Sequence, residues 1–198
     1  MTEVHAGMRQ ERLRHVGRDV VLIVLGAVLA YVGEEWRDAR HKRERVETAL
    51  NSIRDELEAN AALVSQARAK HLFLIDTLGK LVNSHQFPPP TIYTNGMWNP
   101  ANVTSTAWQT ARETGTLADL PLATVLEIAP VYADQDRYRA YADGIAVSIL
   151  TDLRRTSVDA VTREHFAQFI PLDIDFSNRE RVLLAEYTHA IRRLKDIR

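Results

Sequence analysis

Residues 46–84 read VETALNSIRDELEANAALVSQARAKHLFLIDTLGKLVNS, and the fold of the chain is built on this stretch. Its apolar side chains recur at alternating steps of four and three residues, the spacing that keeps one side of a helix against a partner helix. The pattern predicts one long helix that ends near Ser84, in front of three consecutive prolines. The heptad seam of this helix consists of Val46, Leu50, Ile53, Leu57, Asn60, Val64, Ala67, His71, Leu74, Leu78 and Leu81.

Two polar residues, Asn60 and His71, interrupt this heptad seam. One interpretation is a buried polar layer that specifies the register of the bundle or senses protons. The other is that both residues lie at the edge of the apolar stripe, or form hydrogen bonds across a bundle. The sequence leaves both interpretations open, and we treat neither residue as a predicted site.

Further helices are expected downstream, separated by glycine and proline. A short helix over 105–113 should end at Gly115 in a left-handed cap. The next helix begins near Pro121 and carries its apolar stripe to residue 153, and Pro130 should kink or divide it. Because helices with one apolar stripe can bury it only against one another, the sequence predicts an all-α antiparallel helical bundle.

The last helix carries a capping-box signature, Ser177-Asn-Arg-Glu180. In such a box the serine hydroxyl accepts the amide hydrogen of residue 180, and the glutamate reaches back to the amide of the serine. The helix is therefore expected to start at Ser177. Residues 166–169 should form a turn or loop that Pro171 ends. The apolar stripe of the helix is Leu184, Tyr187, Ile191 and Leu194.

The stretch between the first two helices, residues 85–102, is irregular. Asn95-Gly96 is a strong turn signal, and Ile92-Tyr93 is predicted to pair with Met97-Trp98 as a very short hairpin. Three aromatic residues of this loop either form a contact surface or cover the end of the bundle, and they are Phe87, Tyr93 and Trp98.

Upstream of the bundle, residues 20–33 read VVLIVLGAVLAYVG, a long uncharged apolar run. We predict a transmembrane anchor over 19–35, although fourteen helical residues span only roughly 21 Å. Arg18 can extend outward, and Tyr31 and Trp36 suit the interface. A signal peptide cleaved after Val28-Leu29-Ala30 and a buried helix of a soluble domain remain open as alternatives.

The orientation of this anchor is hard to predict, because arginines and lysines flank it on both sides. A short tail is easier to retain than to translocate. We therefore expect residues 1–18 in the cytoplasm and residues 36–198, a charged stalk followed by the bundle domain, in the periplasm of a bacterial inner membrane.

The composition argues against several classes of protein. The 198 residues carry a net charge of −1, so nucleic acid is not an expected partner. Cysteine does not occur, which excludes disulfides, thiol nucleophiles and cysteine-ligated metals. The seven histidines form no i, i+4 pair, and no phosphate-binding or nucleophile motif occurs. Asp173 opens a calcium-loop-like run that lacks the required glycine and glutamate. We predict no enzyme and no catalytic, cofactor-binding or metal-ligating residue.

One set of motifs has a familiar form: Arg18-Asp19 before the apolar run, Glu34-Glu35-Trp36 after it, and the segment WQTARETGTL over 108–117, followed by Val131-Tyr132. With these motifs the chain resembles an uncharacterised family of small proteobacterial single-pass membrane proteins. The resemblance covers most of the chain. It implies an inner-membrane location and an all-helical domain, and it supplies no activity and no site residues.

Two classes of function follow from these observations. The first is a non-catalytic, membrane-anchored interaction or accessory protein, with the lipid bilayer and a protein partner as its contacts. The partner can also be a second copy of the chain. Such self-association would use the heptad helix or the anchor, where Gly26, Ala30 and Gly33 form a small-residue face. The second class is an extracytoplasmic ligand-sensing bundle, which would need a partner to carry its output.

Overall fold

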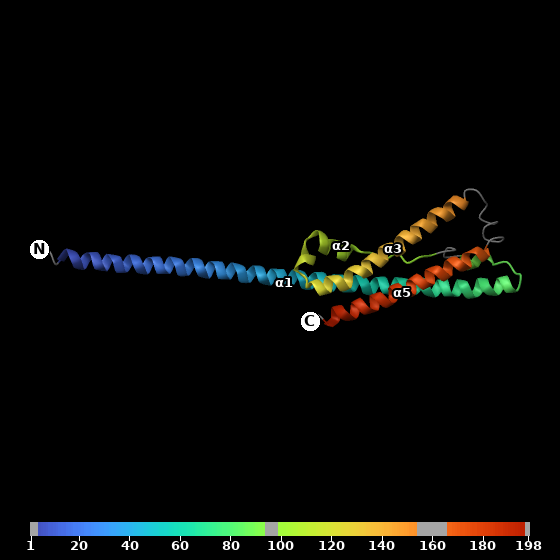
Figure 1. Cartoon of the computed structure of the whole chain (residues 1–198), viewed down its shortest axis with the longest axis horizontal. Helices are drawn as coiled ribbons and strands as arrows, with labels where there is room; N and C mark the ends of the chain where they lie inside the picture. The colour runs from blue at the N-terminus through green and yellow to red at the C-terminus, as the bar shows by residue number, and fades with distance from the viewer. Residues whose placement is uncertain (1–3, 94–98, 154–165, 197–198) are drawn as a thin grey trace. The chain divides into compact units, whose positions relative to one another are not determined.

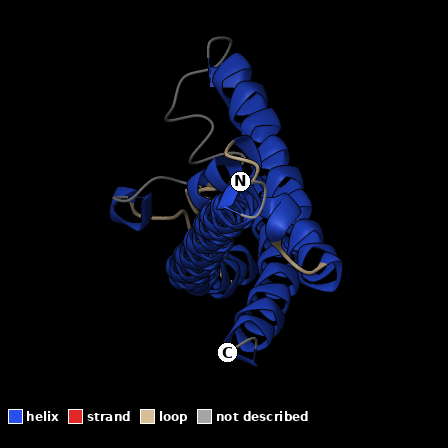
Figure 2. Ribbon diagram, turned by 90° about the vertical axis from the view of Figure 1, so that its left-hand side faces the viewer, coloured by secondary structure: helices blue, strands red, loops and turns tan. Residues whose placement is uncertain are grey.

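The computed structural model describes residues 4–93, 99–153 and 166–196. For residues 4–21, 23, 24, 27, 90, 93, 152 and 153 it describes the backbone and not the side chains. Every element in these ranges is helical (Figures 1 and 2), which confirms the all-α prediction and the helical bundle. The α-helices are α1 (Val4–Asn83), α2 (Thr106–Glu113), α3 (Leu122–Leu153) and α5 (Phe169–Asp196). Short 3₁₀ turns are η1 (Pro90–Tyr93), η2 (Thr116–Asp119) and η3 (Phe166–Gln168).

The chain divides into two units, Met1–Glu47 and Thr48–Arg198, and the division falls within α1. In the first unit the helix carries charge pairs one turn apart, such as Arg40 with Glu44 at 2.9 Å. The second unit contains the packed bundle, which is formed by residues 48–83 of α1 together with α2, α3 and α5.

The transmembrane anchor predicted over 19–35 is not supported. Among the residues that the structure describes, no helix is both long enough and apolar enough to cross a membrane. The physical reason is the short apolar run, which is bounded by Arg18 and Asp19 on one side and by Glu34 and Glu35 on the other. Part of the predicted anchor, the side chains of 19–21, 23, 24 and 27, lies outside the described residues.

The helices of the bundle do not all alternate in direction, so the antiparallel prediction is wrong for one pair. Successive contacts of α3 with α1, Tyr132 with Glu56 and then Gln135 with Asn60, advance along both helices, so these two helices are parallel. Helix α5 is antiparallel to both (Figure 1). Its residue Glu180 contacts His71 and Tyr138, whereas its later residues Lys195 and Arg193 pair with the earlier Glu58 and Glu127. The chain between α1 and α3 returns along the bundle, and this crossover makes the parallel pair possible.

The heptad seam predicted for α1 is confirmed from Ile53 to Leu78, where every seam residue is buried, whereas Val46, Leu50 and Leu81 are half-buried. Helices α3 and α5 each present a seam with the same alternating steps of four and three residues. The seam of α3 is Thr124, Ile128, Val131, Gln135, Tyr138, Ala142, Ile145 and Ile149. The seam of α5 is Phe169, Asp173, Phe176, Glu180, Leu183, Tyr187, Ala190 and Leu194.

The structure bears on several local predictions, and it confirms one of them. Pro130 lies inside α3 without dividing it. Pro171 does not end a segment but sits in the first turn of α5, where the amide that proline lacks would have no helical partner. Ile92 belongs to the η1 turn instead of a hairpin strand, and the other half of that hairpin lies outside the described residues. Gly115 has a φ of 74°, as its predicted left-handed role requires.

Candidate functional site

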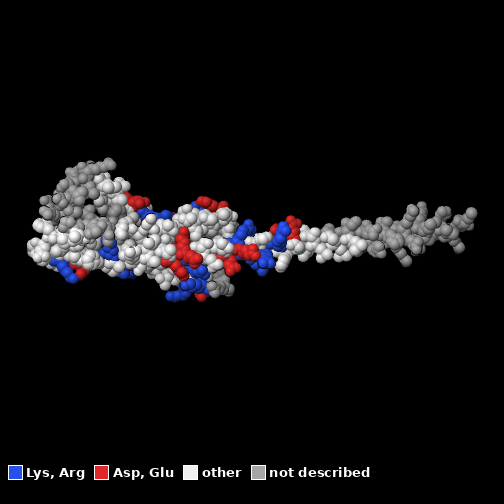
Figure 3. All heavy atoms as spheres, turned by 180° about the vertical axis from the view of Figure 1, so that it is seen from behind, with Lys and Arg blue, Asp and Glu red and all other residues white. Residues whose placement is uncertain are grey.

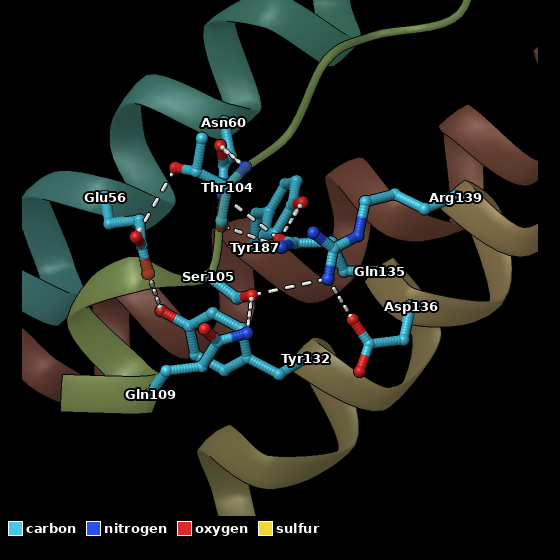
Figure 4. Close-up of polar contacts among 10 residues, drawn as sticks. All are labelled: Glu56, Asn60, Thr104, Ser105, Gln109, Tyr132, Gln135, Asp136, Arg139 and Tyr187. Carbon is cyan, nitrogen blue, oxygen red and sulfur yellow. Dashed lines mark hydrogen bonds and ion pairs between the residues drawn. The ribbon is translucent and has the colours of Figure 1, made fainter. Parts of the chain in front are cut away.

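Asn60 connects three parts of the bundle through its side-chain amide, which is buried (Figure 4). Its Nδ2 donates to the Thr104 carbonyl at 2.7 Å and to Gln135 Oε1 at 3.0 Å, and its Oδ1 accepts from the Thr104 amide at 3.0 Å. Gln135 Nε2 also donates to the Thr104 carbonyl at 2.7 Å, and the Tyr187 hydroxyl donates to Gln135 Oε1 at 2.7 Å. This polar layer therefore joins α1, α3, α5 and the returning segment.

Glu56 extends the layer toward α2 and acts as a cap from another helix. Its Oε1 accepts from the Tyr132 hydroxyl at 2.8 Å, and its Oε2 accepts from the Ala107 amide at 2.9 Å. Ala107 lies in the first turn of α2, and Ser105, the residue before that helix, makes no side-chain cap of its own. The carboxylate thus supplies the acceptor and the negative charge that a helix N-terminus favours.

The rim of this polar layer is also hydrogen-bonded. Ser105 Oγ accepts from Gln109 Nε2 at 2.9 Å and from Arg139 Nη2 at 3.3 Å, and Arg139 pairs with Asp136 (Figure 4). Burial, followed by the Glu56 contact, raises the pKa of Tyr132, so its hydroxyl stays protonated and serves as a donor. Because these groups satisfy one another inside the chain, the layer is suited to fixing the register of the bundle rather than to chemistry.

A second polar layer contains acidic groups and a histidine, all buried. His71 Nδ1 lies 3.0 Å from Glu180 Oε2, and the Tyr138 hydroxyl donates to Glu180 Oε1 at 2.9 Å. The Ala101 amide in turn donates to the Tyr138 oxygen at 2.8 Å. A carboxylate accepts hydrogen bonds at both oxygens. With Tyr138 donating to Oε1, we therefore assign His71 Nδ1–H as the donor to Oε2.

Asp173 lies in the same layer, but unlike Glu180 its carboxyl group has no hydrogen-bond partner among the described residues. The residue is 1% exposed. Burial raises the pKa of Asp173 to about 7, with a further increase from Glu180 and partial offsets from His71 and Lys70. At neutral pH this carboxyl is therefore poised between its neutral and charged forms.

Aromatic rings close the second layer. Phe176 stacks on the His71 ring with centroids 5.3 Å apart, and Tyr138 meets Phe176 edge-on at 6.0 Å. Tyr141 also packs against Phe176, at 5.1 Å, with the Arg179 guanidinium 3.9 Å above the Tyr141 ring. Within the ranges given above, no three histidine or acidic side chains are arranged to hold a metal ion.

The structure excludes one part of the second interpretation of Asn60 and His71, a place at the edge of the stripe, and bears out its other part, hydrogen bonds across the bundle. Both are buried and hydrogen-bonded across the bundle, so neither lies at the edge of the stripe. The predicted capping box is wrong: Ser177 is inside α5, and Glu180 bonds to His71 and Tyr138 instead of to a backbone amide.

The two buried carboxylates of α5 were not predicted as buried, although a signal existed. Asp173 and Glu180 both fall on the alternating four-and-three spacing that runs from Phe169 to Leu194. That spacing places two acidic residues in a buried seam. The capping-box pattern and the apolar stripe that begins at Leu184 favoured a helix start at Ser177, and this start excluded Asp173 from the helix.

Removing the Asn60 amide should destabilise the bundle. In Asn60→Ala the Thr104 amide loses its partner and the buried layer loses volume, so the free energy of unfolding should fall by about 2 kcal/mol. Urea denaturation followed by circular dichroism measures this change. Asn51→Ala, an exposed position on the same helix, is the matched control and should change stability by no more than about 0.5 kcal/mol. Equal effects of the two substitutions would contradict the role of the layer.

Asp173→Asn should stabilise the protein at neutral and basic pH. The folded pKa of about 7 lies above the ordinary value of 3.8, so the folded state holds its proton longer than the unfolded state does. The free energy of unfolding should therefore fall as the pH rises from about 4 to about 7, and this loss is complete above pH 7. The substitution should recover about 2 to 4 kcal/mol at pH 8.

The neighbouring substitution Asp175→Asn is the control for that measurement. A hydrogen bond from Tyr141 and the pairing with Arg179 hold the pKa of Asp175 below its usual value, so losing this carboxylate should lower stability, not raise it. Denaturation at several pH values distinguishes the two variants. A wild-type stability that does not decline between pH 4 and pH 7 would contradict the assignment of Asp173.

Comparison with models of protein families, with characterised proteins and with solved structures found no match to this chain. The resemblance to small proteobacterial membrane proteins consequently stays a prediction.

Proposed function

We propose that this protein is a non-catalytic, membrane-anchored interaction or accessory protein of the bacterial inner membrane. One observation carries the proposal: large apolar side chains of α1 in the first unit are between 52% and 69% exposed. They are Leu22, Leu25, Val28, Leu29, Tyr31, Val32 and Trp36. Apolar surface of this extent marks a membrane or protein contact site in other proteins.

A bilayer suits this segment better than a single partner helix does. Leu22, Leu25, Leu29 and Trp36 follow one side of the helix, whereas Tyr31 points to another side. A partner helix would cover one stripe, but lipid surrounds the whole circumference. The run of fourteen residues is short, so the proposal requires Arg18 and Trp36 to lie at the two interfaces of the membrane.

The bundle supports a role in binding rather than in catalysis. Its first polar layer is satisfied internally, and the central side chains of both layers are buried. On the face drawn in Figure 3, acidic and basic side chains of the bundle are interspersed, which gives no support to a nucleic-acid partner. Phe87, 65% exposed, supports the loop after α1 as a contact region for a protein partner.

A second candidate function, ligand sensing through a partner, is favoured by a cleft at one side of α1. Gln66, Lys70 and Phe73 line it from α1, and Thr91, Ile92 and Asn99 line it from the segment that follows. A cation and amides beside apolar side chains would suit the carboxylate and the hydrocarbon part of a small organic acid. Equilibrium dialysis of the purified chain against labelled carboxylic acids tests this alternative.

Leu25→Arg should release the protein from membranes. An arginine in the middle of a span costs about 2.5 to 3.5 kcal/mol of insertion free energy, and a short apolar run has little to spare. Wild type should resist carbonate extraction, and the variant should appear in the supernatant or be degraded. Leu72→Arg places the same charge on an exposed position of α1 in the bundle, and should stay in the membrane pellet. A wild type that carbonate extracts, or a variant that stays in the pellet, would contradict the anchor.

The proposed orientation has its own test. The short arginine-bearing tail is proposed to lie in the cytoplasm and the bundle in the periplasm. Alkaline phosphatase joined after Arg198 should therefore be active, and green fluorescent protein at the same position should not fluoresce. The opposite pair of results would place the bundle in the cytoplasm.

A further inference from the structure

The second polar layer lies between two apolar cores of the bundle, and the partly buried Leu172 packs against both cores. The main core draws on all three long helices, with Leu57 of α1, Ile128 of α3 and Leu183 of α5 among its members. On α5, Asp173 lies between Phe169 of the smaller core and Phe176 of the main one. The acidic layer is thus the boundary between the two. The buried residues of the smaller core are Leu74, Leu78, Phe166 and Phe169.

Among the residues that the structure describes, fewer buried side chains form the small core than form the main core. Of the described residues, four buried side chains from α1, η3 and α5 belong to the small core, and partly buried neighbours such as Ile149 and Ile170 pack against them. Local opening costs less free energy where less apolar surface is buried, so this end of the bundle should open before the main core unfolds.

Charged and titratable groups face Asp173 from each long helix. His71 and Lys70 belong to α1, Glu180 belongs to α5, and Tyr138 of α3 reaches the layer through its bond to Glu180. Glu180 is held by two donors, whereas the Asp173 oxygens have no hydrogen-bond partner among the described residues. When Asp173 ionises, a negative charge therefore enters the layer with no hydrogen-bond donor among the described residues, and His71 and Lys70 offset it only in part.

We propose that Asp173 and its layer form an acid-closed latch: while Asp173 is protonated the first two turns of α5 stay packed against α1, and its ionisation lets them open while the main core stays folded. The latch consists of His71, Tyr138, Asp173 and Glu180.

The direction of the pH response follows from linkage. In the open form the carboxyl is exposed and ionises near its ordinary pKa of 3.8, but in the closed form it keeps its proton up to about pH 7. The open population should thus rise by up to about tenfold for each pH unit between about 4 and 7, and should be constant above pH 7.

Hydrogen exchange on the full chain in mild detergent tests the latch. After correction for intrinsic exchange rates, protection of the amides of residues 173–179 should fall roughly 30- to 100-fold between pH 5 and pH 7.5. Their exchange should depend weakly on urea, because a local opening exposes little surface. The amides of 187–194 should exchange only through an opening with the urea dependence of complete unfolding.

Two variants and one control make the result specific. Asp173→Asn should keep the acid level of protection at pH 7.5, and Asp175→Asn should respond to pH as wild type does. Lys70→Met removes a cation that lowers the pKa of Asp173, so protection should go on falling to a higher pH before it levels off. Three results would overturn the proposal. They are protection of 173–179 that does not depend on pH, the same pH dependence in Asp173→Asn as in wild type, and exchange of 173–179 with the urea dependence of complete unfolding.

Discussion

A polar side chain at a seam position of a helical bundle must find its hydrogen-bond partner on a neighbouring element, because burial removes it from water. Asn60, Gln135 and Tyr187 hold such positions on three different helices and satisfy one another. Aliphatic seams tolerate a shift by one heptad, but these three groups meet in one register alone. The alignment of α1, α3 and α5 depends on this match.

The returning segment before α2 is the second part of that constraint. Thr104 offers both its amide and its carbonyl to the layer, so backbone, and not a fourth helix, fills the space beside Asn60. Glu56 then anchors the start of α2. Because the chain returns in this way, α3 runs parallel to α1, and only α5 opposes them.

The two polar layers are built from the same three helices but differ in how well their hydrogen bonds are satisfied. In the first, donors and acceptors are matched, which makes the layer rigid. In the second, Glu180 is matched and Asp173 is not, so the layer responds to protons. The bundle thus combines a rigid main core with an end that we propose to open, and the chain also carries an apolar segment in its first unit. This arrangement suits a protein that binds partners rather than one that catalyses a reaction.

The helical periodicity, the end of α1 before the prolines and the left-handed Gly115 could all be predicted from the sequence, because each depends on neighbours within a few residues. The direction of α3 and the role of Glu180 could not, because they depend on contacts across the bundle. Ser177 and Glu180 match a local cap, but His71, 109 residues away, provides the partner that keeps Glu180 buried in a continuous helix. The four-and-three spacing of α5 indicates that Glu180 is buried, but nothing near it in the sequence indicates its partner. The distant contact outweighs the local preference because it satisfies a buried carboxyl group.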